Sequence, residues 1–436
     1  MTVTTLKQAL AAPRAALPGS AASQDIRARA LAELGAAGLP TPRREDWRYT
    51  DLKPLVDAEL DFAPRGPDAA AIEAAERALA ERAVSAGGPR LVFVDGHLVP
   101  RLGTLASTKS DIEVRDLDAY WLRPDAARGA RVSAVAHPLA ALNAAYAQSG
   151  AWLRIAEGAR IAEPLSIVMV ASGAQKLVAQ PRLVVEVGRG AELSLIQHIL
   201  DAADTDAWLN VVTEVALAEG SKLSLYRIQE HGDRHAHTSL LAVDIAARAS
   251  AALGLFDLGG RLVRNDIDVQ LREPGGALDL YGLLLAGEGQ HVDDHTRIDH
   301  VAPDTRSNEA FRGLIGRRGR GVFNGKVVVH RGARGIDAHQ SSDNLLLSDQ
   351  AEIDTTPELE IYSDDVKCSH GSTVGELDAE HLFYLRSRGI DEPYAREILT
   401  TAFAATVLER IAAQEVRASV ADKVGVRLRA LSEVSR

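Results

Sequence analysis

The sequence reads Gly190-Ala-Glu-Leu-Ser-Leu-Ile-Gln-His-Ile-Leu200 and, 30 residues later, Gly220-Ser-Lys-Leu-Ser-Leu-Tyr-Arg-Ile-Gln-Glu230. Each stretch begins with glycine, and an apolar residue follows three positions later. The same Gly-x-x-apolar pattern occurs at Gly158–Ile161 and Gly275–Leu278, with a degenerate copy at Ser250–Leu253, so that successive copies lie 32, 30, 30 and 25 residues apart. Steps of this size without a helix between them are typical of strands stacked in a repeating coil.

Three β architectures compete for this pattern. A sandwich of this length would carry Asn-Gly or Asp-Gly hairpin signals at a spacing of about 8–12 residues, and few occur. A propeller would repeat a motif in every blade, and none is present. We therefore predict a mainly β protein with a parallel β-helix at 151–376. A mostly helical region at 1–150 precedes it, and a helical region at 377–436 follows it.

Helical spacing marks both flanking regions. In the N-terminal region it predicts helices at Gln24–Leu34 and Asp68–Ser85, with an ordered loop at Arg43–Leu52 between them. In the C-terminal region Asp391 is a capping residue for the next helix. Apolar side chains then recur every four residues, at Leu399, Phe403, Val407 and Ile411. This stripe indicates either a cap on the end of the coil or a docking surface, because repeat bodies require caps.

The net charge and the cysteine content narrow the range of possible functions and partners. The net charge of −11 argues against a nucleic acid or an anionic membrane as a partner bound by charge alone. We interpret the basic patch Arg317, Arg318 and Arg320 as a solvated turn between strands. The single cysteine, Cys368, permits no intrachain disulfide. No signal peptide and no apolar run of the ~18 residues that a membrane span needs are visible, so we expect a cytoplasmic protein.

Two polar stretches resemble a metal-binding site and a catalytic site. In a strand, His291, Asp293 and His295 share one face and are competent ligands for zinc or iron. Arg297 lies in the same row, so a salt-bridged ladder on the outer face of the coil explains the stretch equally well. The acidic residues between Glu352 and Asp365 alternate with apolar ones, and we interpret them as a solvated strand face rather than a pair of catalytic carboxylates.

The third candidate is the pair Cys368 and His370. Two residues apart on a strand, the thiol and the imidazole point to the same side, and both can bind iron. Two ligands do not complete a four-ligand site, so any others must come from elsewhere, most simply from a partner chain. A nucleophilic cysteine and a buried structural thiol remain alternatives. No GxxxxGK[ST] loop occurs, so the chain should not hydrolyse ATP by itself.

A further set of strings is dense between about 280 and 400 and fainter elsewhere. They are Trp47–Asp51, Arg320–Val327, Asp337–Gln340, Asn344–Ser348, Glu352–Thr355, Pro357–Ile361 and Leu382–Ile390. Together these strings resemble the SufB/SufD family, whose members assemble iron–sulfur clusters. Within that family, Asp364–Gly371 is similar to the SufD branch, and the single cysteine agrees, because SufB chains carry several.

The resemblance implies a right-handed parallel β-helix in a scaffold subunit that is not itself an enzyme. It implies pairing with SufB through the β-helix and with the SufC ATPase through the C-terminal helices. Leu399, Phe403 and Val407 would then form a SufC-docking stripe, although some of these side chains face the core. A homodimer remains an alternative for the isolated subunit.

The resemblance also implies a role for Cys368 and His370. They match positions at the SufB–SufD interface, where a transient iron–sulfur cluster forms after ATP-driven movement of SufC opens that interface. Whether a flavin binds the complex stays open. The competing functions are a SufB-like principal scaffold, a β-helix carbohydrate-active enzyme, and a SufD that holds its partners without supplying a ligand.

Overall fold

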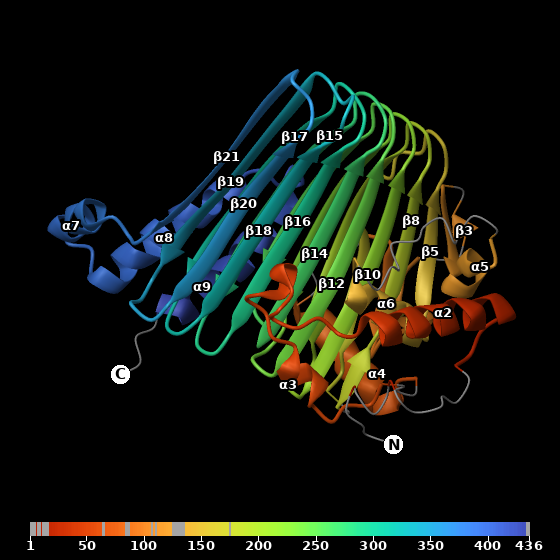
Figure 1. Cartoon of the computed structure of the whole chain (residues 1–436). Coiled ribbons are helices and arrows are strands. Elements are labelled where there is room, and N and C mark those ends of the chain that lie inside the picture. Colours follow the sequence, from red (N-terminus) through yellow and green to blue (C-terminus); the bar gives the residue numbers. More distant parts are fainter. Residues whose placement is uncertain are drawn as a thin grey trace.

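Strand follows strand from β5 (Gly150–Ile155) to β21 (Val366–Gly375), with no helix between them in the described part of this segment. The computed structural model describes residues 6, 10, 17–62, 66–82, 88–105, 108–109, 111–123, 136–173 and 176–432. Each strand of the coil pairs in parallel with strands of the neighbouring turns, so the chain winds into an elongated β-solenoid with helices near both termini (Figure 1). This confirms the predicted mainly β fold.

The strands of the described chain form two sheets, which face each other across the coil. The 10-stranded sheet has the order β2 (His97–Leu98), β1 (Arg90–Val94), β6 (Leu165–Ala171), β9 (Glu192–Asp201), β11 (Lys222–Glu230), β13 (Ser250–Asp257), β15 (Ala277–Ala286), β17 (Arg306–Ile315), β19 (Ile336–Leu346), β21. The 11-stranded sheet has the order β20 (Glu352–Ile361), β18 (Arg320–Val329), β16 (His291–His300), β14 (Leu262–Leu271), β12 (His235–Ile245), β10 (Ala207–Leu217), β8 (Arg182–Val187), β5, β4 (Ile112–Asp116), β3 (Thr108–Lys109), with β7 (Leu177–Ala179) beside β10.

The inner faces of both sheets form the core because side chains alternate along each strand. Leu223 in β11 lies opposite Leu193 in β9 and Ala251 in β13, and Ala251 lies opposite Leu278 in β15. These residues belong to one continuous apolar cluster that extends along the coil. The stacking buries apolar surface at roughly 25 cal/mol per Å², which makes the repeated apolar position the main source of stability.

The turns explain the glycine of the repeat and correct one copy of it. Gly158, Gly190, Gly220 and Gly275 all have positive φ, between 64° and 77°. Arg248 takes the same turn position with φ 55°, so the degenerate copy is Arg248–Ala251 rather than Ser250–Leu253. The prediction was shifted by two residues because the glycine that marks the turn elsewhere is an arginine here.

The N-terminal region covers one end of the solenoid and part of its outer surface. Helix α6 (Pro138–Tyr146) packs on β10 and β12 through Ala140, Val212 and Leu240, and α2 (Ala21–Ala37), which contains the first predicted helix, packs on α6. The second predicted helix is α4 (Ala69–Arg82), on β1 and β6; residues 83–85 of that prediction lie outside the described residues. The other helices in the described part of the N-terminal region are η1 (Glu45–Trp47), α3 (Lys53–Val56), η2 (Pro100–Leu102) and α5 (Leu117–Trp121).

The C-terminal helices divide into a packed pair and a projecting helix. Helices α8 (Glu392–Leu408) and α9 (Gln414–Ser432) lie on the outer face of the 10-stranded sheet, where Val407 and Leu428 share an apolar cluster with Tyr281. Asp391 caps α8 as predicted, since its side chain accepts a hydrogen bond from the Tyr394 backbone N–H. Helix α7 (Ala379–Ser387) buries none of its residues and projects beyond the solenoid (Figure 1).

Candidate functional site

The last coil of the solenoid leaves both sheets with an open edge. Strand β21 ends the 10-stranded sheet and β20 ends the 11-stranded sheet, and no described strand pairs with the far side of either. From Lys367 to Gly375 every residue of β21 except Cys368 is exposed, and β20 has no buried residue. In the preceding coils, most inner-face side chains are buried. The open end is therefore a surface at which inner-face side chains become accessible.

Cys368 and His370 lie two residues apart on β21, at this open end. Cys368 is opposite Ala338 and His370 is opposite Gln340, and both partners are buried inner-face residues of β19. Cys368 is half-buried and packs against the core cluster, whereas His370 is exposed. Ser369, between them, faces outward, where its hydroxyl lies 2.6 Å from Nδ1 of His339. The thiol and imidazole thus share the inward face at the mouth of the solenoid.

The environment of Cys368 favours the thiol over the thiolate in the isolated chain. Burial raises the pKa of Cys368, and the negative charge of Asp337 raises it further, while a backbone hydrogen bond with Ala338 opposes both. A thiolate is the form that binds metals. A cation or a positively charged partner group must therefore drive the loss of this proton.

The acidic stretch is an outer-face ladder, as predicted. Asp354 forms an ion pair with Arg320 at 3.0 Å, and Lys326 forms ion pairs with Glu358 and Glu360. Arg320 belongs to β18, and the other two residues of the basic patch, Arg317 and Arg318, lie in the turn before it. The carboxylates of β20 are thus paired with cations along the outer surface, whereas Asp364 and Asp365 lie in the turn that follows β20.

The His291 stretch is a polar ladder covered by the N-terminal loop. Arg264 forms an ion pair with Asp293 at 2.7 Å, and its guanidinium carbon lies 4.4 Å from the centroid of the Trp47 ring. Thr50 hydrogen-bonds to Asp293 and lies 2.7 Å from Nε2 of His291. The ladder interpretation therefore holds here, because Arg264 and Thr50 both occupy Oδ2 of Asp293 and Nε2 of His295 lies 3.0 Å from Oδ1.

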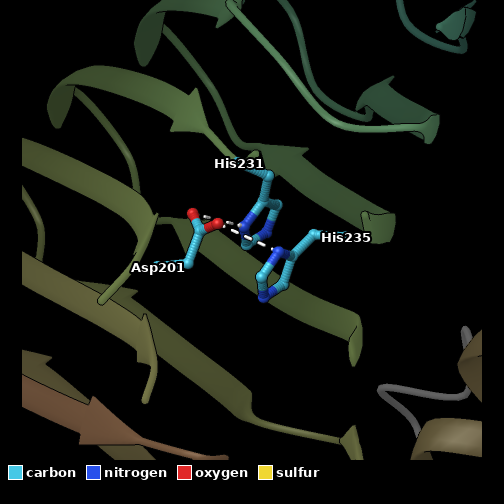
Figure 2. A group of neighbouring side chains, drawn as sticks. All are labelled: Asp201, His231 and His235. Carbon is cyan, nitrogen blue, oxygen red and sulfur yellow. Dashed lines mark hydrogen bonds and ion pairs between the residues drawn. The ribbon is translucent and has the colours of Figure 1, made fainter. Parts of the chain in front are cut away.

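Among the described residues a single group of three His, Cys, Asp or Glu side chains is close enough to hold a metal ion, and sequence reasoning missed it. It consists of Asp201, His231 and His235, all buried (Figure 2). Asp201 and His231 are 30 residues apart, the step between the repeat copies at Gly190 and Gly220. An alignment of the repeat copies would have placed Asp201 and His231 at equivalent positions in neighbouring coils.

The side chains of the predicted apolar stripe on α8 are not all buried to the same extent. Val407 is 1% exposed and packs in the cluster beneath α8 and α9. Leu399 and Phe403 are half-buried, and the guanidinium of Arg312 lies 4.4 Å from the centroid of the Phe403 ring. Exposed large apolar side chains instead occur at Phe383 and Tyr384 on α7 and at Tyr394 on the first turn of α8. Val407 therefore holds α8 on the solenoid.

Comparison with known proteins identifies the family. The model described as "SUF system FeS cluster assembly, SufBD core domain" matches residues 169–403. The chain is 32% identical over 409 residues to the iron–sulfur cluster assembly protein SufD of Escherichia coli, and the alignment covers 91% of each chain. The chain belongs to the SufD family. This SufD family member is also 28% identical over 390 residues to an iron–sulfur cluster assembly SufBD family protein of Synechocystis, which covers 87% of this chain and 85% of that protein.

Membership of the SufD family gives the protein a role in iron–sulfur cluster assembly. Protein ABCI7 of Arabidopsis thaliana, a chloroplast protein, is 31% identical over 242 residues, which are 55% of this chain and 51% of that protein. In the described part of this SufD family member, no helix is both long and apolar enough to cross a bilayer. Its relatives are named as assembly proteins, which is consistent with a non-catalytic subunit.

Proposed function

We propose that the protein is the SufD subunit of a SufBCD complex, joined to SufB through the open end of its β-solenoid. The observation that carries the proposal is the pair of open strand edges at β20 and β21, where Cys368 and His370 share one face. An exposed edge presents a row of unpaired backbone groups, which proteins normally cover or blunt. A second solenoid docked end to end would continue both sheets and cover both edges.

The nascent cluster forms at this junction in the proposal. Cys368 supplies a thiolate and His370 an imidazole, and both are ligands that iron accepts. Two ligands leave the coordination shell incomplete, so SufB supplies the rest. The raised pKa of Cys368 fits this order of events, because the thiol stays protonated until iron arrives. The cluster is cargo that leaves the complex, and the protein itself catalyses no reaction.

SufC docks on the C-terminal helices in the proposal. Phe383 and Tyr384 on α7, with Tyr394 on α8, offer an exposed aromatic surface that nothing in the described chain covers. Aromatic side chains dominate the binding energy of many protein interfaces. Leu399 and Phe403 extend this surface from α8, while Val407 supports the helix from below. ATP hydrolysis belongs to SufC, and the complex works in the reducing cytoplasm, where Cys368 stays available.

Pairing with SufB is tested by a charge at the open end. Val374 is 49% exposed and shares the strand face of Cys368 and His370, whereas Thr373 faces outward next to Asp343. Val374→Lys places an ammonium group in the proposed junction and should abolish capture of SufB. Thr373→Lys can pair with Asp343 and should leave capture unchanged. Equal capture by both variants would show that SufB binds another surface.

The ligand role is tested on the assembled complex. Cys368→Ala and His370→Ala should each reduce the cluster formed in anaerobic reconstitution, measured by visible absorbance and iron content, without loss of SufB or SufC. Ser369→Ala, on the opposite face of β21, is the matched control and should reconstitute normally. Normal cluster yield in both test variants would leave a SufD that holds its partners but supplies no ligand.

A further inference from the structure

Three buried side chains meet at one corner of the solenoid, far along the chain from Cys368. Asp201 is the last residue of β9, His231 follows the end of β11, and His235 is the first residue of β12. The stacking of coils brings them together, because Asp201 and His231 occupy equivalent positions in consecutive coils. The side chain of Asp201 is 5% exposed and both histidine side chains are fully buried.

Both imidazoles direct the same nitrogen at one carboxylate. Nδ1 of His231 lies 3.3 Å from one oxygen of Asp201, and Nδ1 of His235 lies 2.9 Å from the other. Figure 2 shows the two rings on the same side of the carboxylate. The rings are stacked, with centroids 5.2 Å apart and an angle of 4° between their planes. The three ligand atoms lie within 4.8 Å of one another, close enough to share one ion.

An independent observation comes from nitrogen atoms without partners. Nδ1 of His235, which is aimed at Asp201, has no hydrogen-bond partner, and neither has Nε2 of His231, Nε2 of His235 or either ring nitrogen of His237. His237 is completely buried, and its ring centroid lies 5.6 Å from that of His231. Buried polar atoms are nearly always satisfied, so an unpaired imidazole nitrogen aimed at a buried carboxylate points to a ligand between them. An ion bound by Asp201 and the two Nδ1 atoms would satisfy Nδ1 of His235.

The ligand set suits a cation. Metal ligands bind in the deprotonated form, as neutral imidazole and ionised carboxylate.

We propose that Asp201, His231 and His235 bind one divalent first-row transition-metal ion. Two imidazoles and one carboxylate suit iron(II) and zinc(II), whereas magnesium and calcium prefer oxygen ligands. The half-exposed carboxylate of Asp204, 3.7 Å from Nδ1 of His235, provides a route from the surface to the buried ligands. The proposal does not depend on the cluster role of Cys368 and His370, which lie in the last coil.

The site is tested by metal titration of the full-length Cys368→Ala chain, in which no thiol competes for the ion. The metal-free protein is titrated under anaerobic conditions with iron(II), zinc(II), cobalt(II) and magnesium(II). We expect one iron(II), zinc(II) or cobalt(II) ion per chain, visible d–d absorption with cobalt(II), a higher melting temperature with metal, and no response to magnesium(II). The relative affinities distinguish iron(II) from zinc(II) as the preferred ion.

Variants in the same background assign the ligands. His235→Asn keeps a polar side chain near Asp201 but is a poor ligand for these ions, and Asp201→Asn removes the charge while keeping the shape. Each should weaken binding by at least ~100-fold. The matched control is His198→Gln, because His198 is another buried histidine paired with a carboxylate, Glu230, but belongs to no three-ligand group. It should bind like the parent chain.

The titration of the parent Cys368→Ala chain decides whether the site exists even if a ligand variant fails to fold. Absence of cobalt(II) absorption and of bound metal in the parent chain would overturn the proposal and leave a hydrogen-bonded corner, in which Asp201 also accepts the backbone N–H of Gly232 at 2.9 Å. Binding that persists at full strength in folded His235→Asn and Asp201→Asn would also overturn it.

Discussion

Gln340 donates a hydrogen bond from Nε2 to Oε2 of Glu309 at a distance of 2.6 Å, inside the solenoid and directly below His370 in the stacking order. Both residues are buried on the inner face. Burial raises the pKa of Glu309 from its ordinary value of 4.5 to about 7, although the hydrogen bond from Gln340 opposes the shift. A carboxyl group that is largely protonated below neutral pH therefore lies under the open end.

This carboxyl predicts a pH dependence of stability. Between pH 4.5 and about 7 the folded chain holds a proton on Glu309 that the unfolded chain releases, so the free energy of unfolding falls as pH rises through this range. The full effect is about 3 kcal/mol. Glu309→Gln should remove it, measured by urea unfolding at about pH 5 and about pH 8.

The contribution of Glu309 is measured by the difference in unfolding free energy between the parent chain and Glu309→Gln at each pH. Burial also raises the pKa of Asp257, to about 6, so that residue contributes a decline of its own to both proteins. Parallel stability curves for the parent chain and Glu309→Gln would show that Glu309 is ionised in the folded state at low pH.

Removal of Arg264 should strongly destabilise the fold. Its side chain is 2% exposed and neutralises Asp293, which is fully buried. Arg264→Ala would leave that carboxylate without its cation and would release the Trp47 ring that packs on the guanidinium. Loss of one partner of a buried pair costs about 3–5 kcal/mol. We expect a loss of this size in urea unfolding, together with faster proteolysis in the 43–52 loop.

The control for this prediction is Arg318→Ala. Arg318 pairs with Glu288 on the surface, and its side chain is 68% exposed. We expect its unfolding midpoint to match that of the parent chain, because exposed pairs contribute little. If both arginine variants unfold at the same midpoint, the buried pair has no structural role.

Replacement of Arg248 by glycine should stabilise the protein. Arg248 occupies the left-handed turn position, with φ 55°, that Gly220 occupies one coil earlier with φ 65°. A side chain there is strained, so Arg248→Gly should raise the unfolding free energy by about 0.5–1 kcal/mol after the loss of chain entropy is counted. Loss of the exposed ion pair with Glu219 matters little.

The reverse substitution, Gly220→Ala, is the companion measurement. No atom lies within 4 Å of the added Cβ, so only the backbone conformation is tested. We expect a loss of about 1 kcal/mol in unfolding free energy. A gain in Gly220→Ala and a loss in Arg248→Gly would contradict the account of these turns.

Two substitutions in the C-terminal helices should separate partner binding from stability. Phe383 is 74% exposed, so Phe383→Ala should leave the unfolding free energy unchanged but weaken SufC capture in a pull-down assay. Val407→Ala removes buried methyl groups and should lower the unfolding free energy by about 2 kcal/mol. Val426→Ala, on the exposed face of α9, is the control and should change neither quantity. Full SufC capture by Phe383→Ala would exclude the aromatic surface.

Local pattern alone predicted much of this architecture. The glycine at each turn and the apolar residue three positions later, as in Gly190–Leu193, repeat because every coil must turn sharply and bury the same inner position. The adjacency of Cys368 and His370 on one face followed from the two-residue period of a strand. These features are readable because their cause acts within a few residues of one chain segment.

Other features depend on contacts between distant segments, and only the tertiary structure decided them. Val407 and Leu399 follow the same helical stripe, yet the solenoid covers one much more fully than the other. Asp201, His231 and His235 meet only because consecutive coils stack in register, and Arg248 shows how one missing glycine hides that register. Sequence alone specified the coil and its inner face, whereas the order in which coils stack determined which side chains become neighbours and which remain at an open end.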